Sequence, residues 1–199
     1  MIFLSGHIAN DLEHPRLGFI MTPRMGNSIP ETGWLAADTG CFSAPHEYSD
    51  DRYLRFIDRF PRGRMLFATA PDVLGDHVAT VERSHSILKK IRQLGIAAAF
   101  VAQDGWGETS TPWEDLDVLF VGGTTEFKYR GGRDAVLAAK RHGKRAHMGR
   151  ANSHQKLRAA WGIGCESADG TFLRFGPHTN RGRLFRWFDL LDQRGELAV

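Results

Sequence analysis

The chain of 199 residues contains only two cysteines, no long apolar run and very few acidic residues in one long segment near its C-terminal end. With Cys41 and Cys165 alone, a disulfide scaffold and a four-cysteine zinc site are excluded. Both thiols are expected to be reduced, which points to the cytoplasm. No apolar stretch approaches the roughly 20 residues that a membrane helix needs, so no membrane partner is expected.

Other familiar signals are missing as well. The first residues, MIFLSGHIAND, have no basic flank and no long apolar stretch, so we expect a first strand rather than a signal peptide. A P-loop and a dinucleotide-type glycine-rich turn are absent, and no cofactor is therefore expected. Without an internal repeat, a low-complexity segment or a linker, residues 1–199 are predicted to form one domain.

The charge is unevenly distributed. Residues 128–186 hold 14 Lys and Arg against three acidic residues, a balance of +11, whereas the rest of the chain carries −8. Because neutralisation of phosphates dominates non-specific nucleic-acid binding, this segment predicts a polyanionic partner. The alternative is a solvated basic face on an enzyme for small substrates.

Eight short, nearly continuous apolar runs predict strands that are buried on both faces, as in a parallel sheet. They span residues 2–5, 17–22, 33–38, 65–70, 97–102, 117–122, 144–148 and 162–168. Helices are predicted at 49–60, 76–94, 133–142, 152–161 and 184–193. In the longest of them, one apolar stripe is expected, made of Val78, Val81, His85, Leu88, Ile91 and Leu94.

Strands that alternate with helices imply right-handed βαβ units and an α/β fold. Eight units in 199 residues suit a compact (β/α)8 TIM-like barrel. Residues 6–16 and 23–32 have no long helical pattern, so degenerate first crossovers are expected. An incomplete barrel or an open doubly wound sheet also fits this pattern.

Acidic residues and glycines recur where the predicted strands end. These positions are Asp38, Asp72, Gln103, Asp104, Gly122, Gly123, Met148, Gly149, Glu166 and Asp169. In a parallel barrel they would gather at the C-terminal mouth, where such enzymes have their active sites. Taken singly, Asp38 can form a turn, Asp72 can cap a helix, and Asp169-Gly170 can form a reverse turn. As a set on one rim, they predict an active site.

Carboxylates around a pocket can supply a nucleophile and a general acid/base for displacement at an anomeric carbon. A carboxylate that lies near another resists ionisation, so one can keep a proton while its neighbour attacks. The two glycines, Gly122 and Gly123, let the backbone approach a flat ligand, and Gln103 offers a donor and an acceptor to a base edge. A nucleobase fits this combination better than a sugar phosphate does.

Six short motifs then resemble, in order, those of the tRNA-guanine transglycosylase superfamily. ADTGCFS resembles its Asp-Ser-Gly-Gly-Phe-Gln signature, with Cys41 and Ser43 in place of the second Gly and the Gln. The next two segments of the family, which recognise the base and contain Val-Gln-Gly, are resembled by FATAPD and FVAQDG. Its glycine pair and its Met-Gly strand are resembled by FVGG and AHMGR, and its nucleophile segment by GIGCESADGTFLR. The resemblance covers residues 34 to about 175.

The resemblance implies exchange of guanine in a polynucleotide for a 7-deazaguanine through a covalent glycosyl-enzyme. Asp169 would be the nucleophile and Asp38 the general acid/base. Glu166, three residues before Asp169, is the alternative nucleophile under a shifted alignment. The implied base-binding residues are Asp72, Gln103, Gly122, Gly123, Met148, Gly149 and Phe42. His147 and His46 lie nearby and are interpreted as structural histidines.

Two departures from the family narrow the prediction. The chain lacks the three-Cys, one-His zinc cluster of the tRNA enzymes, so no metal is expected, and it is much shorter than they are. Both features favour the 7-deazaguanine DNA transglycosylases of phages and bacterial genomic islands, which would work in the host cytoplasm if phage-encoded. DNA is then the expected partner, ahead of tRNA. The residues expected on the DNA backbone are Lys128, Arg130, Arg133, Lys144, Arg145, Arg150, Lys156, Arg181 and Arg183.

Two other functions stay open on the sequence alone. One is a glycosidase or base-exchange enzyme for free nucleosides or nucleotides, which the short chain favours. The other is a non-catalytic protein that binds a modified base or DNA, for which the substitutions in the motifs, Cys41, Ser43 and Glu166, leave room.

Overall fold

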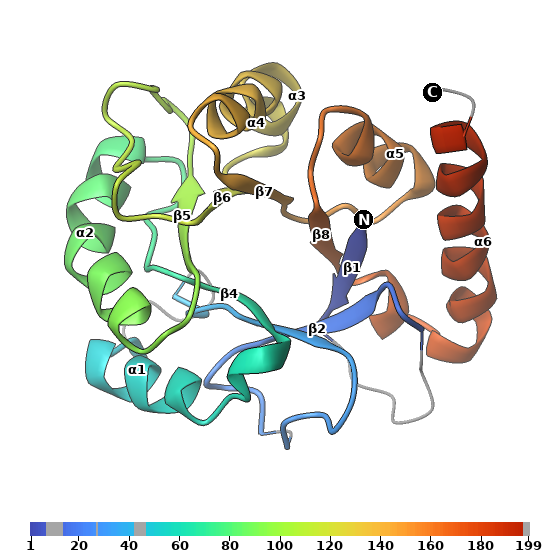
Figure 1. Ribbon diagram of the computed structural model, residues 1–199, viewed down its shortest axis with the longest axis horizontal. Coiled ribbons are helices and arrows are strands. Elements are labelled where there is room, and N and C mark those ends of the chain that lie inside the picture. The colour runs from blue at the N-terminus through green and yellow to red at the C-terminus, as the bar shows by residue number, and fades with distance from the viewer. Residues whose placement is uncertain (7–13, 27, 42–46, 197–199) are drawn as a thin grey trace.

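The chain folds into a closed barrel of eight parallel strands that follow one another around the barrel in chain order (Figure 1). This computed structural model describes residues 1–6, 14–26, 28–41 and 47–196. The strands are β1 (Ile2–Ser5), β2 (Leu17–Met21), β3 (Trp34–Ala37), β4 (Met65–Thr69), β5 (Ala98–Ala102), β6 (Val118–Val121), β7 (Arg145–Met148) and β8 (Ser167–Gly170). The predicted (β/α)8 fold is confirmed, and β8 pairs with β1 to close the sheet, so the open and incomplete alternatives are wrong.

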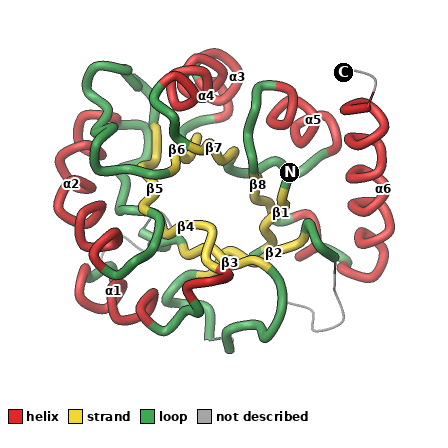
Figure 2. Tube along the Cα trace, viewed as in Figure 1, coloured by secondary structure: helices red, strands yellow, loops and turns green. Residues whose placement is uncertain are grey.

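Helices form an incomplete ring outside the strands (Figure 2). They are α1 (Asp50–Asp58), α2 (His77–Gln93), α3 (Thr125–Arg130), α4 (Gly132–Arg141), α5 (His154–Gly162) and α6 (Pro177–Glu196), with short 3-10 turns η2 (Arg62–Arg64) and η3 (Phe172–Arg174). The described residues of the crossover from β2 to β3 contain no helix, as the sequence predicted, whereas most of the crossover from β1 to β2, residues 7–13, lies outside the described residues. The crossover from β5 to β6 contains none either. No helix in the described part of the chain is long and apolar enough to span a membrane.

The alternation of side chains along each strand divides the apolar residues into two cores. Leu4, Ala36, Phe67, Val101 and Phe120 fill the inside of the barrel. Residues one position away, such as Phe3 and Ala37, face outward and pack with the helices. The same parity decides which side chains at the strand ends point into the barrel.

The eighth strand differs from its prediction. The expected run at 162–168 begins with residues that end α5, which extends to Gly162, and Gly164 then turns the chain with a positive φ of 96°. The strand itself is Ser167–Gly170, so it is polar and contains Asp169. A strand with alternating polar residues gives no continuous apolar signal, which explains the shift.

The predicted stripe of α2 is also wrong in its N-terminal half. Val78 is 67% exposed and His85 is exposed, whereas His77, Thr80 and Ser84 are buried together with Ile87, Leu88 and Ile91. The two hydroxyl groups are satisfied within the helix or by the preceding loop: Thr80 Oγ1 donates to the Asp76 carbonyl at 2.7 Å, and Ser84 Oγ donates to the Val81 carbonyl at 3.2 Å. A small hydroxyl that bonds locally can be buried like an apolar residue.

Candidate active site

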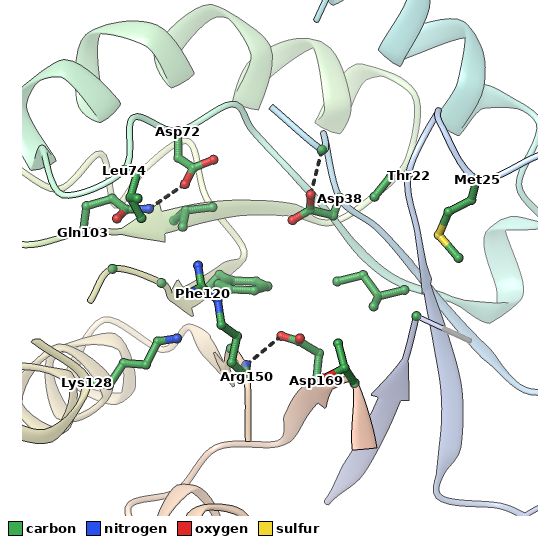
Figure 3. A pocket seen from close by; sticks show the side chains of 18 of the residues that line it. Thr22, Met25, Asp38, Asp72, Leu74, Gln103, Phe120, Lys128, Arg150 and Asp169 are labelled. Carbon is green, nitrogen blue, oxygen red and sulfur yellow. Dashed lines mark hydrogen bonds between the residues drawn. The ribbon is translucent and has the colours of Figure 1, made fainter. Parts of the chain in front are cut away.

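A cavity of about 530 Å³ opens at the C-terminal ends of the strands (Figure 3). Asp38, Gln103, Gly122 and Asp169 stand two residues beyond inward-facing positions of β3, β5, β6 and β8, so the strand parity turns them inward. Asp72, Gly123 and Gly149 line the same cavity. The prediction that the strand-end residues meet on one rim therefore agrees with the geometry for these seven positions.

Asp38 faces Asp169 across this cavity (Figure 3). Its Oδ1 accepts a hydrogen bond of 2.7 Å from the Gly40 amide, in a turn where Gly40 has a φ of 70°. Burial, helped by the nearby charges of Asp72 and Asp169, outweighs the opposing Gly40 hydrogen bond and Arg150 and raises the pKa of Asp38 to about 6. Asp38 can therefore both give and take a proton near neutral pH.

Asp72 is held by two side chains from neighbouring parts of the rim. Gln103 Nε2 donates to its Oδ2 at 2.5 Å, and the Cys41 thiol lies 3.1 Å from its Oδ1. Gln103 is 1% exposed and its Oε1 accepts from the Gly75 amide at 3.1 Å. Gln103 thus orients Asp72 rather than presenting both polar atoms to a ligand. Cys41, which the sequence marked only as a departure from the family motif, has the same orienting role.

Asp169 is held by a buried histidine that the sequence interpretation set aside as structural. His147 on β7 is 0% exposed and its Nε2 lies 3.1 Å from Asp169 Oδ1. Its Nδ1 lies 2.8 Å from Ser167 Oγ, and Phe67 and Phe120 pack on the ring. A carboxylate only accepts hydrogen bonds, so Nε2 carries the hydrogen that is donated to Asp169.

A second donor also reaches this oxygen, because the Arg150 amide lies 3.4 Å from Oδ1. Among the described residues, both of these hydrogen bonds fall on Oδ1, which leaves Oδ2 as the oxygen that can meet a ligand. The parity of β7 and β8 was a signal for this contact: His147 and Ser167 are paired in register and point into the barrel together.

The glycines at the strand ends are required by close packing. A Cβ on Gly122 would lie 2.6 Å from Val101 Cγ1, and one on Gly149 would lie 2.8 Å from Phe120 Cε1. Gly123 has a φ of 69°, and its Cβ would lie 2.7 Å from Asp104 Oδ2. Gly122, Gly123 and Gly149 line the cavity, so their backbone forms part of its wall.

Three of the predicted site residues do not contribute in the expected way. Glu166 precedes β8, is exposed, pairs with Lys140 and accepts from the Ala146 amide at 2.8 Å, so it lies at the N-terminal end of the barrel and cannot be the nucleophile in this cavity. Met148 points outward beneath the helices and not onto a target base in the active-site cavity, because His147 takes the inward position. Phe42, like His46, lies outside the described residues.

The basic residues predicted on the DNA backbone separate into groups. Lys128 and Arg150 line the active-site cavity, and they lie with Arg133 and Lys156 around a second cavity beside it. Arg130 is exposed on α3 and pairs with Glu126 at 3.1 Å. On α6, Arg181 and Arg183 are exposed, and the Arg183 guanidinium lies over the Phe172 ring.

Lys144 and Arg145 stand at the start of β7, at the opposite end of the barrel from the cavity. Arg145 donates to the Leu66 carbonyl at the start of β4. Their prediction as contacts to a strand bound at the active site is therefore wrong. The sequence interpretation missed Arg174 of η3, which lines the active-site cavity.

The cavity contains the carboxylates of Asp38, Asp72 and Asp169. The buried His147 donates a hydrogen bond to Asp169, and basic side chains line one side of the cavity. In the described part of the chain, no group of three or more His, Cys, Asp or Glu side chains is placed to hold a metal ion. Asp169 with an unengaged Oδ2 suits nucleophilic attack, and Asp38 suits proton transfer from the opposite wall.

Comparison with known proteins adds information on the fold alone. No family profile and no curated protein matches the chain. Among solved structures, it is similar to tryptophan synthase from M. tuberculosis, with 11% identity, a TM-score of 0.50, and coverage of 79% of this chain and 59% of that one. It is also similar to the Bacillus subtilis YkuI protein, with an EAL domain, in complex with c-di-GMP and calcium: 17% identity, a TM-score of 0.47, and coverage of 87% and 46%.

The methylaspartate ammonia lyase from Clostridium tetanomorphum is a third such structure, with 16% identity, a TM-score of 0.47, and coverage of 82% and 44%. The chain thus spans about half the length of these structures. At such identities the likeness identifies the architecture only. The chain has the TIM-barrel fold, and its activity has to be argued from its own site.

Proposed function

We propose that this protein is a DNA base-exchange transglycosylase, which replaces guanine with a 7-deazaguanine derivative through a covalent glycosyl-enzyme intermediate. The observation that carries the proposal is the pair Asp38 and Asp169, which face one cavity from opposite sides with different surroundings. One carboxyl has its pKa raised to about 6, and the other has one oxygen held by His147. Two carboxylates in unlike environments can divide the work of acid and nucleophile.

In the first half-reaction, Asp169 Oδ2 attacks the anomeric carbon of the target nucleotide. The bond to the glycosidic nitrogen breaks with its electron pair leaving on guanine, and protonated Asp38 gives its proton to the departing base. The sugar is then held as an ester of Asp169, and its two phosphodiester bonds are untouched. The Asp72 carboxylate, fixed by Gln103 and Cys41, accepts hydrogen bonds from the N–H groups on the guanine edge.

In the second half-reaction, the 7-deazaguanine occupies the same place. Ionised Asp38 takes the proton from its glycosidic nitrogen, which attacks the anomeric carbon and displaces the Asp169 carboxylate. Two inversions give net retention of configuration, and Asp38 ends the cycle with the proton that it had at the start.

The test is incorporation of radiolabelled guanine into double-stranded DNA and into tRNA. Exchange of guanine for guanine needs no assumption about which deazaguanine is the natural substrate. We expect label in DNA, loss of exchange and of the denaturant-stable protein–DNA adduct in Asp169→Asn, and a decrease of about 10² to 10⁴-fold in Asp38→Ala.

Glu166→Gln is the matched control, because it neutralises the rival carboxylate at the far end of the barrel. It should exchange guanine like the wild type. Undiminished exchange in Asp169→Asn would reject the assigned nucleophile. Label that enters only free nucleosides would favour the small-substrate alternative, and DNA binding without exchange of any base would favour the non-catalytic one.

A further inference from the structure

A second cavity lies directly beside the active site. It has a volume of about 320 Å³ and is formed by α3, the start of α4, the turn after β7, and α5. It shares Lys128, Gly149 and Arg150 with the active-site cavity, so the two spaces adjoin along these residues. We call it the side pocket.

The side pocket collects positive charge. Lys128, Arg133, Arg150 and Lys156 line it, and none of the described lining residues is acidic. Within the described part of the chain, Arg133 and Lys156 make no ion pair. Burial, followed by the charge of Arg150 and, more weakly, that of Lys156, lowers the pKa of Lys128 to about 8 against the opposing charges of Asp169 and Asp104. Such crowding is relieved by an anion bound among the cations.

The remaining wall is mainly apolar. Met148, Ala160 and Ile163 line it, together with the polar Thr125 of α3 and Asn152 of the turn after β7. Tyr129, also a lining residue, is 66% exposed on α3. Cations beside an apolar floor and an exposed aromatic ring fit a phosphate joined to a planar base, since bases stack on aromatic side chains irrespective of their identity. An inorganic anion alone would leave the apolar part of this wall without a partner.

Arg150 links the two cavities. It has a φ of 60°, the only positive value among the described non-glycine residues. In this unusual conformation its amide points to Asp169 (Figure 3), and Arg150 lines both spaces. A ligand in the side pocket therefore lies next to the nucleophile, at the place expected for the next unit of a strand.

We propose, resting on the proposed function, that the side pocket binds the phosphodiester and the base of the nucleotide adjacent to the flipped guanosine. The phosphate lies among Lys128, Arg133, Arg150 and Lys156, and the base packs against Met148, Ile163 and Tyr129. The protein thereby holds two successive nucleotides and not one. The barrel itself would then contact the polymer on both sides of the reacting nucleotide's glycosidic bond.

Fluorescence anisotropy and competition titrations can test this. The probes are a labelled single-stranded DNA trinucleotide with guanine in the middle, the mononucleotide deoxyguanosine 5′-phosphate, and inorganic phosphate. We expect the wild type to bind the trinucleotide about tenfold or more tightly than the mononucleotide, because base stacking adds to the phosphate contacts. In Arg133→Gln/Lys156→Gln this advantage should be lost, and the slope of log Kd against log salt should become shallower by about 0.7, as expected when one phosphate loses the cations that neutralise it.

Two further variants separate the effect of the side pocket from the effect of net charge. Lys144→Gln/Arg145→Gln removes the same charge at the opposite end of the barrel and should keep the wild-type affinity and salt slope. Ala159→Phe fills the side pocket without changing the charge, so it should weaken trinucleotide binding by about tenfold with an unchanged slope. Equal affinities of the wild type for trinucleotide and mononucleotide, or an equal loss in the Lys144/Arg145 control, would overturn the proposal.

The guanine-exchange assay on the same proteins distinguishes this inference from the proposed function. Exchange by a wild type whose trinucleotide affinity is insensitive to Arg133→Gln/Lys156→Gln would reject the side pocket and keep base exchange. Trinucleotide affinity that depends on these two cations, in a protein that exchanges no base, would keep the side pocket and reject base exchange.

Discussion

At the scale of single residues, Asp38 combines a functional advantage with a cost in stability. Its folded-state pKa is about 6 against an ordinary value of 3.8, chiefly because burial disfavours the charged form. The folded state therefore favours the protonated side chain, and the free energy of unfolding falls as the pH rises from the ordinary pKa of 3.8 through the folded-state pKa of about 6. At pH 8, where Asp38 is ionised in both states, the fold bears the full cost.

We therefore predict that Asp38→Asn stabilises the protein at pH 8 and leaves its stability nearly unchanged at pH 4. The expected gain in the free energy of unfolding at pH 8 is on the order of 2 to 3 kcal/mol, from a pKa shift of about two units. Asn keeps an oxygen that can accept from the Gly40 amide. Denaturant unfolding at both pH values measures this, with the exposed Asp51→Asn as control. The same gain at both pH values would show that burial of the charge is not its cause.

His147 is a positioning residue, since it acts through Asp169 and lies beneath the cavity floor. We predict that His147→Leu, which keeps apolar bulk but removes the donor, lowers kcat for guanine exchange by about 10²-fold with a much smaller change in KM. His147→Gln places an amide N–H near the position of Nε2 and should recover part of the rate. Single-turnover formation of the protein–DNA adduct measures the step directly.

A purely structural role for His147 makes a different prediction. In that case, both substitutions would reduce activity in proportion to their loss of thermal stability, and the glutamine variant would show no selective recovery of adduct formation. The comparison of the two variants at matched stability decides between these roles.

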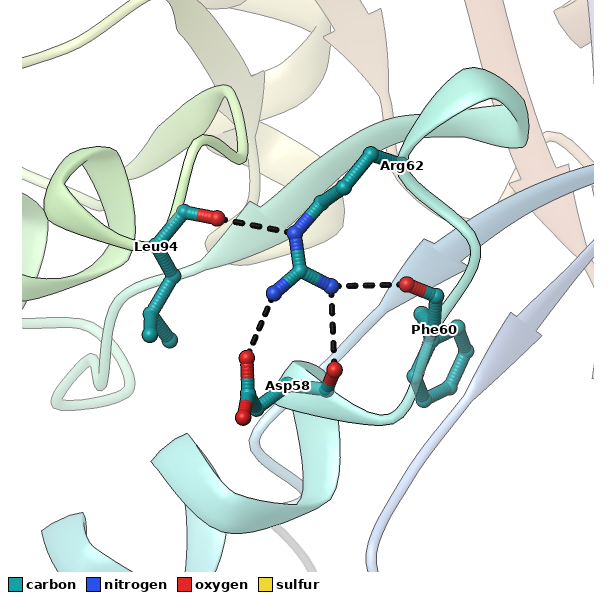
Figure 4. Close-up of polar contacts among 4 residues, drawn as sticks. All are labelled: Asp58, Phe60, Arg62 and Leu94. Carbon is teal, nitrogen blue, oxygen red and sulfur yellow. Dashed lines mark hydrogen bonds and ion pairs between the residues drawn. The ribbon is translucent and has the colours of Figure 1, made fainter.

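At the scale of elements, one arginine connects the ends of two helices. Arg62 in η2 donates from Nη1 to the carbonyls of Asp58 and Phe60, from Nη2 to the Asp58 carboxylate at 2.5 Å, and from Nε to the Leu94 carbonyl at 2.8 Å (Figure 4). These are carbonyls at the C-terminal ends of α1 and α2, which have no partner inside their helices. The planar guanidinium can reach all of them at once.

We predict that Arg62→Ala lowers the free energy of unfolding by about 1 to 2 kcal/mol and that Arg62→Lys does not restore it, because an ammonium group cannot make the same set of contacts. The neighbouring Arg59→Ala is the matched control and should change stability by less than about 0.5 kcal/mol, as exposed substitutions usually do. Urea unfolding measures both. Full rescue by lysine would mean that charge near the helix ends, not the hydrogen-bond geometry, provides the stabilisation.

The strands also show how much of the fold could be predicted from the sequence. Seven strands were located within one or two residues because a buried parallel strand is a continuous apolar run. The eighth was displaced because its residues, Ser167 to Gly170, alternate in polarity. Which face a residue takes depends on a shift of one position, and for this reason His147 and Met148 were assigned to each other's surroundings.

At the scale of the whole molecule, the order of the strands gathered Asp38, Asp72, Gln103 and Asp169 from distant parts of the sequence into one cavity. That much follows from fold class and strand ends. The distribution of charge over the surface could not be predicted in this way, because the start and the end of a strand lie at opposite ends of the barrel. Lys144 and Arg150 are six residues apart in the sequence, yet only Arg150 is at the active site.

The shape of the molecule also bears on its substrate. Asp169 and His147 lie on the inward side of β8 and β7, so the anomeric carbon must enter the barrel mouth to be attacked. A nucleotide stacked in a duplex cannot reach this depth without leaving the stack, and unpairing and unstacking it costs a few kcal/mol. Under the proposed function, contacts of the barrel to the flipped base and to its neighbour would offset part of that cost.

We therefore predict that guanine exchange is faster where the target base is already poorly paired. A duplex with an abasic site opposite the guanine should have a kcat/KM about tenfold or more above that of the same duplex with a G·C pair, because less of the binding energy is needed for flipping. The difference should shrink in Asp38→Ala if proton transfer to the base then limits the rate. Equal kcat/KM values for the two duplexes in the wild type would mean that flipping does not contribute to the barrier. The chemistry would then have to take place on a base that the protein meets unstacked.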